Sequence, residues 1–173
     1  TLVLSDVAIQ GGGVGVLRGW LHADDVTVDG APIAVSRERF ASPLWLDRVE
    51  VRNAPGPALD LSGWNFHVGP NAVLQQSQFP VRVNGGLMPG SQVPASGNAQ
   101  NVVIANLLIG SSTWGRLAVP YVVTGFPQVG GSNLEIEAGT PVELGPAGGL
   151  LFYAGAGIQA RGTEQAPIAF RRR

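Results

Sequence analysis

The sequence predicts an all-β solenoid, a coil of short strands stacked turn upon turn, on three observations. The 25 glycines and 13 prolines separate short segments rich in valine, isoleucine and leucine, as turns separate strands. No stretch of about a dozen residues has helical apolar spacing free of glycine and proline. One phrase also returns along the chain, as DVAIQG from Asp6, DVTVDG from Asp25, RVEVRN from Arg48, NVVIAN from Asn101 and NLEIEA from Asn133.

The returning phrase has the period of a β-strand. Its first apolar residue, here called the anchor, is followed two positions later by another apolar residue, and alternate residues of a strand point to one face. We therefore expect both residues to point inward. Successive anchors are 19, 23, 53 and 32 residues apart, and a period of about 20 to 50 residues indicates stacked repeats. The anchors are Val7, Val26, Val49, Val102 and Leu134.

The residue four positions after the anchor predicts a shared corner. It is Gly11, Gly30, Asn53 and Asn106 in four of the phrases, and Ala138 departs from the pattern. Glycine and asparagine adopt the left-handed backbone conformation at low cost, so each strand would end in the same sharp turn. The strands would then stack as parallel ladders about 4.8 Å apart. Residues 1–173 are expected to form one domain of about 6–7 coils.

Two stretches depart from this rhythm, residues 84–100 and residues 110–133, whereas the segment from Ile33 is the best candidate for a helix. NGGLMPGSQVPASGNAQ, residues 84–100, predicts a long loop, to which the sequence assigns no role. IAVSRERFAS, from Ile33, predicts one short helix or a protruding loop. Loops on a rigid scaffold often carry function, but an insertion rich in glycine, proline and serine is also readily tolerated.

Composition excludes several kinds of function. The formal net charge is −1 and the chain contains neither lysine nor cysteine, which excludes a Schiff-base lysine, a disulfide, a thiolate nucleophile and a cysteine-ligated metal. Four of the eleven arginines lie beyond residue 160, so we expect no basic face and no nucleic-acid partner. No apolar run reaches the roughly 18 to 20 residues of a membrane span.

The last fifty or so residues resemble the right-handed parallel β-helix proteins that bacteria secrete or display. Such proteins often carry a strand phrase followed by EAGT, here residues 137–140, and a closing GTEQAPIAF, here residues 162–170. LDRVEVRNAPGPALDLSG, from Leu46, is similar to the coils of the broader pectate-lyase-like superfamily. The resemblance implies a right-handed, single-stranded parallel β-helix at a secreted or cell-surface location. It also implies a fragment of a larger protein, because the closing unit usually leads into further coils.

The same resemblance raises the alternative of a polysaccharide lyase or glycoside hydrolase. LWLDRVEV, residues 44–51, is similar to the Trp-x-Asp-His strand phrase of pectate lyases, with Arg48 in place of the histidine. Asp47 and Arg48 are therefore the candidate catalytic residues, although the sequence offers no calcium-binding cluster of carboxylates beside them.

Other carboxylates do not predict a catalytic pair. A glycosidase needs two of them about 5 to 9.5 Å apart. Glu50 and Glu135 are expected at equivalent outward positions several turns apart. Asp24 and Asp25 are neighbours that should point to opposite faces.

The ligand-binding candidates are tryptophans, because an indole ring offers a flat apolar face to a sugar. Of Trp20, Trp45, Trp64 and Trp114, we select Trp64 and Trp114, with packing in the core as the competing interpretation. His22 and His67 have no partner at metal-ligand spacing. We predict no metal and no cofactor.

Three hypotheses follow. The leading one is a noncatalytic scaffold or adhesion module, secreted or displayed on the cell surface. The second is the polysaccharide-degrading enzyme, and the third is a module that binds a polysaccharide or surface glycan without catalysis. An uncovered solenoid end would expose strand edges, so end-to-end self-association is also expected.

Overall fold

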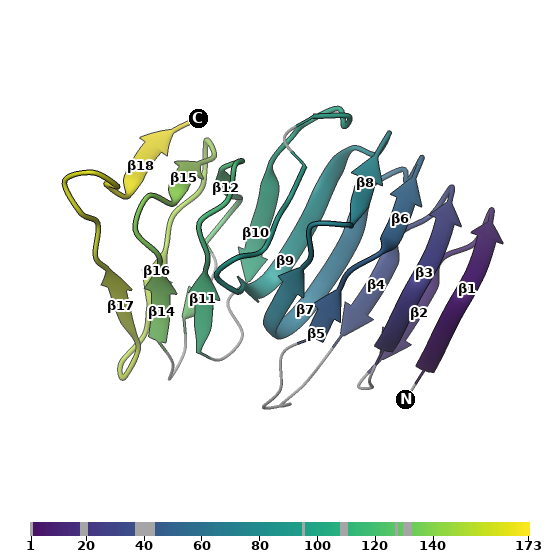
Figure 1. Ribbon diagram of the computed structural model, residues 1–173. Helices are drawn as coiled ribbons and strands as arrows, with labels where there is room; N and C mark the ends of the chain where they lie inside the picture. The colour runs from purple at the N-terminus through teal and green to yellow at the C-terminus, as the bar shows by residue number, and fades with distance from the viewer. Residues whose placement is uncertain are drawn as a thin grey trace.

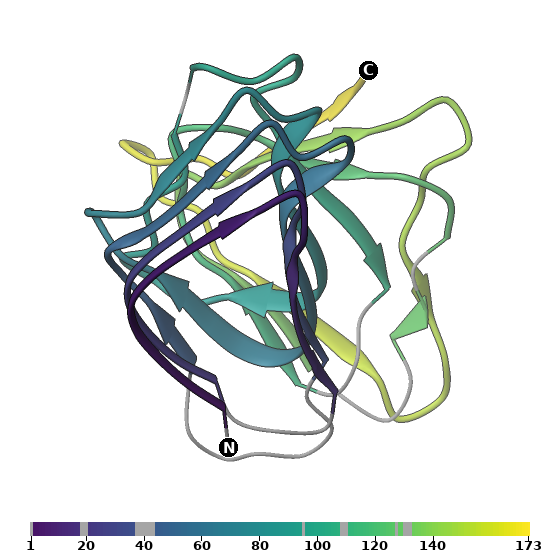
Figure 2. The ribbon, with the colours of Figure 1, turned by 90° about the vertical axis from the view of Figure 1, so that its right-hand side faces the viewer.

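The chain winds into an all-β solenoid of about 6 turns with parallel sheets, as the sequence predicts (Figure 1). This computed structural model describes residues 2–17, 21–36, 44–94, 96–107, 111–126, 128–129 and 133–173. Each coil runs along three faces, here called A, B and C (Figure 2). Seen from the N-terminal end, the chain turns clockwise as it recedes, which is the right-handed sense (Figure 2).

The strands of all three faces pair in parallel with their counterparts in the next coil. Face A holds β6 (Val49–Arg52), β8 (Val73–Gln75) and the parts of β1 (Leu2–Gln10) and β3 (Leu21–Asp29) that follow the bends at Asp6 and Asp25. Face B holds β2 (Val14–Leu17), β4 (Ile33–Ser36), β7 (Pro57–Val68), β9 (Phe79–Leu87), β10 (Val103–Leu107), β12 (Tyr121–Val123), β15 (Pro141–Leu144) and β18 (Ala169–Arg172).

Face C holds β5 (Leu44–Leu46), β11 (Ser112–Trp114), β14 (Asn133–Ile136) and β17 (Gly157–Ala160). The long strands β7 and β9 bend from face B onto face C, which joins these two faces into one sheet. The strands β13 (Gln128–Val129) and β16 (Leu151–Phe152) form a separate small ladder. None of the described residues belongs to a helix that could cross a membrane.

Columns of inward side chains fill the interior. On face A, Val7 pairs with Val26 and Val26 with Val49, as the anchors predict. Burying side chains of this size contributes roughly 1.5 to 3 kcal/mol each. The longest column runs along face B through Val14, Ile33, Leu59, Val81, Val103, Tyr121 and Val142, and it ends at Phe170, which is 46% exposed.

The predicted corner lies between faces A and B. Gly11, Gly30 and Asn53 all have positive φ angles, of 67°, 90° and 55°. The Asn53 side-chain amide also donates a hydrogen bond of 2.7 Å to the Asp29 carboxylate of the previous coil. The fourth member of the corner is Gln76, with φ 56°, whereas Asn106 lies inside β10 on face B. Its assignment to this corner was wrong.

Two of the five phrases lie on other faces. Val102 directly precedes β10 on face B, and Leu134 belongs to β14 on face C, so neither continues the column of Val7, Val26 and Val49. The reason is geometric. Every face of the coil uses the same inward and outward alternation, so the phrase identifies a strand but not its face.

The predicted loop at residues 84–100 and the segment from Ile33 both begin as strands. Residues 84–87 belong to β9, and the segment after them follows the previous coil, with backbone hydrogen bonds of 2.8 Å from Met88 to Phe66 and from Gln100 to Gln78. Only residues 84–87 continue the strand, and the described residues of 88–100 lie outside the strands, so the predicted loop begins after Leu87. Ile33–Ser36 is a strand instead of the start of a helix, and residues 37–43 lie outside the described part of the chain.

Replacing Leu61 by alanine should lower the free energy of unfolding by about 2–5 kcal/mol, because a cavity is left in a packed column. Leu61 is fully buried and stacks between Val35 and Val83. Urea unfolding would measure the loss. The matched control is Leu151→Ala, whose side chain is 42% exposed and should cost much less. An equal loss of unfolding free energy in both variants would contradict the packing of Leu61 in a buried column.

Replacing Gly85 by alanine should destabilise the bend between faces B and C by about 3 kcal/mol or more, since it adds both backbone strain and a steric clash. Gly85 has φ 144°, and a Cβ atom there would lie 1.8 Å from the Gly63 carbonyl oxygen. Gly56→Ala is the control, because no atom lies within 4 Å of its added Cβ. Thermal unfolding of both variants tests this, and an unchanged Gly85→Ala protein would be the contrary result.

Candidate functional site

The candidate site surrounds the corner where the chain passes from β5 on face C to β6 on face A. In β5, Leu44 and Leu46 point into the core and Trp45 between them is 58% exposed. Asp47 and Arg48 then turn the corner, and Asn71 occupies the equivalent place one coil later, since Glu50 pairs with Val73. We call the set Asp24, Asp25, Trp45, Asp47, Arg48 and Asn71 the corner site.

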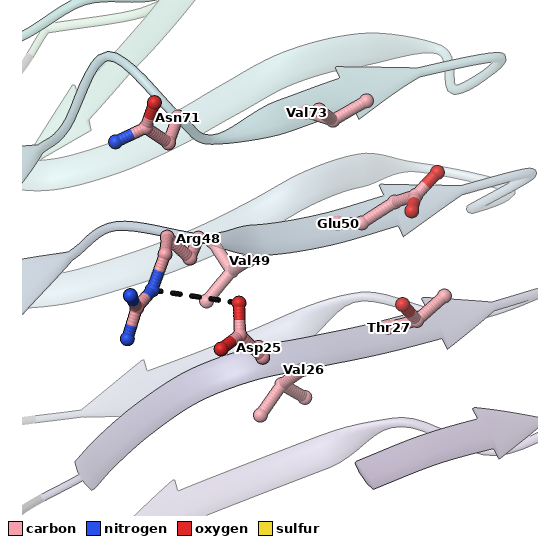
Figure 3. Close-up of a pocket in the computed structure, with 8 residues that line it drawn as sticks. All are labelled: Asp25, Val26, Thr27, Arg48, Val49, Glu50, Asn71 and Val73. Atoms are coloured by element: carbon pink, nitrogen blue, oxygen red, sulfur yellow. Dashed lines mark ion pairs between the residues drawn. The ribbon is translucent and has the colours of Figure 1, made fainter. Parts of the chain in front are cut away.

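Two shallow depressions flank this corner and share Arg48 and Asn71. The one beside Trp45 has a volume of about 280 Å³ and is lined by Ala23, Asp24, Trp45, Asp47, Arg48 and Asn71. The other lies on face A, has a volume of about 290 Å³ and is lined by Asp25, Val26, Thr27, Arg48, Val49, Glu50, Asn71 and Val73 (Figure 3).

Arg48 is held by two carboxylates of the preceding coil. Its Nε donates a hydrogen bond of 2.8 Å to Asp24 Oδ1, and its Nη2 also contacts that oxygen. The same Nε lies 3.4 Å from Asp25 Oδ1 (Figure 3). The hydrogen bond and charge of Asp24, and then the charge of Asp25, raise the pKa of Arg48.

Asp24 and Asp25 therefore reach the same guanidinium, although strand alternation predicts that they point to opposite faces. Alternation fails here because Asp25 has φ 52° and turns the corner. Asp6 and Arg48, with φ 53° and 48°, occupy the same corner in the neighbouring coils. A left-handed residue other than glycine costs roughly 1–2 kcal/mol, so this corner is a second, strained turn, which the sequence pattern did not predict.

Asp47 is fixed by the next coil. Its carboxylate accepts hydrogen bonds from the Asn71 backbone amide, at 2.9 Å, and from the Asn71 side-chain amide, at 3.1 Å. These two bonds lower the pKa of Asp47 below its usual value of 3.8. The carboxylate also lies over Gly69, where an added Cβ atom would sit 2.3 Å from Asp47 Oδ1. The position of this negative charge is therefore set by the stacked backbone.

Trp45 packs on a buried histidine of the next coil. Its ring centroid lies 3.9 Å from that of His67, with the two planes tilted by 33°, and the strand register places the residues opposite each other. His67 is 9% exposed, and its Nδ1 atom finds no hydrogen-bond partner among the described residues. Burial lowers the pKa of His67, and the charge of Asp47 offsets part of this effect.

Of the two tryptophans selected from the sequence, Trp114 does not line this site. Trp114 is fully buried, stacks on Tyr121 with ring centroids 4.9 Å apart, and donates its indole N–H to the Gly85 carbonyl at 3.1 Å. A sugar platform needs an exposed ring, so the buried Trp114 cannot serve as one. Trp64 lies in β7, and its side chain falls outside the described part of the chain, as do Trp20 and the His22 side chain.

Comparisons of the chain with protein-family models, with curated proteins and with solved structures found no match. The resemblance to the pectate-lyase-like superfamily therefore stays a prediction.

The other candidate groups remain dispersed. Glu50 lies on face A and Glu135 on face C, so they differ in face as well as in coil. Among the described residues, no three histidine, aspartate or glutamate side chains gather closely enough to hold a metal ion. The sequence analysis did not predict that Trp45, Asp24 and Asn71 lie together in one site. The alternation in LWL could have placed Trp45 outward, but only the coil register brings Asn71 beside it.

Replacing His67 by phenylalanine should reduce the loss of stability in mild acid. The folded pKa lies below the usual 6.5, so the unfolded chain takes up the proton first. The stability that comes from neutral His67 is complete above pH 6.5 and is lost as the pH falls through the window below it. The free energy of unfolding of His67→Phe should therefore vary less between about pH 7 and about pH 5.

Urea unfolding at a series of pH values measures this difference. Phenylalanine keeps an aromatic ring against Trp45. The stability that ionised Asp47 contributes is lost only at pH values below 3.8, so its loss does not overlap with the protonation of His67. Parallel pH profiles for the two proteins would contradict the assignment.

Proposed function

We propose that this chain is a noncatalytic β-solenoid scaffold, secreted or displayed on the cell surface, that binds a saccharide at the corner site. The observation that carries the proposal is the exposed Trp45 ring on the wall of a depression of about 280 Å³. An aromatic ring 58% exposed on a packed strand is apolar surface that a sugar ring can cover. The location rests on the resemblance of residues 120–170 to secreted β-helix proteins.

The polar groups around Trp45 suit recognition. Sugar hydroxyls need acceptors and donors at fixed positions, and Asp24, Asp47 and Asn71 line the same depression. Hydrogen bonds between coils hold Asp47 and Asn71 in place. A site whose side chains are already ordered loses less conformational entropy when a ligand binds.

The same contacts weigh against the alternative of a lyase. A lyase would need Arg48 to accept a proton, but its two carboxylate partners stabilise the charged guanidinium and raise its pKa. Asp47, the other catalytic candidate, is held as a carboxylate by Asn71. Both residues therefore serve better as fixed charges than as a base and an acid.

Replacing Trp45 by alanine should weaken binding of the recognised oligosaccharide at least about tenfold, because a central aromatic contact is removed. Binding to a panel of plant and bacterial oligosaccharides would be measured by titration calorimetry. Trp45→Phe should retain part of the affinity. Tyr153→Ala removes an aromatic residue that is 48% exposed in the last coil and serves as the control.

Two outcomes would contradict the proposal. One is equal affinity in the wild-type and Trp45→Ala proteins for every saccharide that binds. The other is release of unsaturated, ultraviolet-absorbing products from a polysaccharide, with activity lost in Arg48→Ala, which would support the lyase instead.

A further inference from the structure

We propose that the corner site selects a saccharide that carries a protonated amine and discriminates against one that carries a carboxylate. This inference rests on the proposed saccharide binding and specifies the chemical class of the ligand. It depends on the charge around the Trp45 depression and on the cation affinity of the indole ring.

The depression and its edge carry an excess of negative charge. Asp24, Asp47 and Arg48 line it, and Asp25 approaches Arg48 from the face A side. Three carboxylates thus surround one guanidinium. Because Asp24 and Asp25 both contact Arg48, its charge is already compensated, and an incoming anion would find no free cation among the described lining residues.

Asp47 is the best acceptor for an ammonium group. It lines the Trp45 depression, and both of its hydrogen bonds with Asn71 stabilise the ionised form. A carboxylate that is already held in place offers a charge-assisted hydrogen bond without first losing side-chain freedom. A uronate at this position would instead place like charges side by side, which is unfavourable.

Trp45 adds a second attraction for a cation. The face of an indole ring attracts a positive charge within about 6 Å of its centroid, and tryptophan is the strongest of the aromatic side chains in this respect. The ring already packs on His67, which carries no charge in its neutral form. An amino sugar could therefore cover the exposed ring with its apolar face and direct its amine toward Asp47.

The experiment compares three oligosaccharides of one length: an N-acetylated one, its N-deacetylated amine form and a uronate. Titration calorimetry in mildly acidic buffer at low and high salt should show the order amine, then neutral, then uronate. The preference for the amine over the neutral form should shrink as salt rises, because exposed charges are screened.

The variant Asp24→Asn tests the role of charge. Asparagine keeps an oxygen that can accept the Arg48 hydrogen bond, so the fold should be retained, and circular dichroism would check this. The ratio of amine affinity to neutral affinity should fall about two- to fivefold, as expected for a partly exposed charge. Glu164→Gln, an exposed position in the last coil, makes the same charge change away from the site and should leave the ratio unaltered.

The possible failures are distinguishable. If none of a broad saccharide panel binds, the proposed function fails, and this inference fails with it. If the neutral and amine forms bind equally at both salt concentrations, or the uronate binds best, the charge selection is overturned while saccharide binding stands. An unchanged affinity ratio in Asp24→Asn would also overturn it.

Discussion

The structure depends on one constraint, the in-register stacking of each coil on the previous one. Parallel pairing places every inward side chain directly above its counterpart, as in the face B column that joins Ile33, Leu59 and Val81. An apolar residue is then required at the same place in every coil, because a polar one would be buried among valine and leucine side chains. Backbone conformation has to repeat for the same reason, and this explains why left-handed residues recur at two corners.

The two corners meet this requirement in different ways, and the difference creates the candidate site. Between faces A and B, Gly11 and Gly30 adopt the left-handed conformation at low cost. Between faces C and A, the residues that adopt the left-handed conformation are Asp25 and Arg48, which carry charged side chains. The Arg48 side chain contacts Asp24 and Asp25 of the preceding coil. Charged groups from neighbouring coils are thereby concentrated at one exposed edge, beside Trp45.

The sequence was sufficient for the class of fold and for part of the register. Alternation and turn residues placed Val26 above Val7 and Asn53 at the corner. They did not place Val102 or Leu134, because coil length varies from 18 residues, between Val103 and Tyr121, to 28, between Val142 and Phe170. Counting residues therefore cannot assign a strand to a face. The site was harder still, since the contacts of Asp47 with Asn71 and of Arg48 with Asp24 both span 24 residues.

The charged groups of the corner site are already paired, and this supports the proposed recognition over catalysis. Proton transfer requires a group with a free lone pair and a pKa near the working pH. Arg48 is committed to two carboxylates and Asp47 to Asn71, so both keep their charges and their positions. His67 Nδ1 finds no hydrogen-bond partner among the described residues, but that atom is buried, and the ring packs against Trp45. Protonation of His67 would consequently alter the support of the Trp45 ring before it could act on a ligand. The rigid ladder thus fixes a charged, aromatic surface, as the proposed binding role requires.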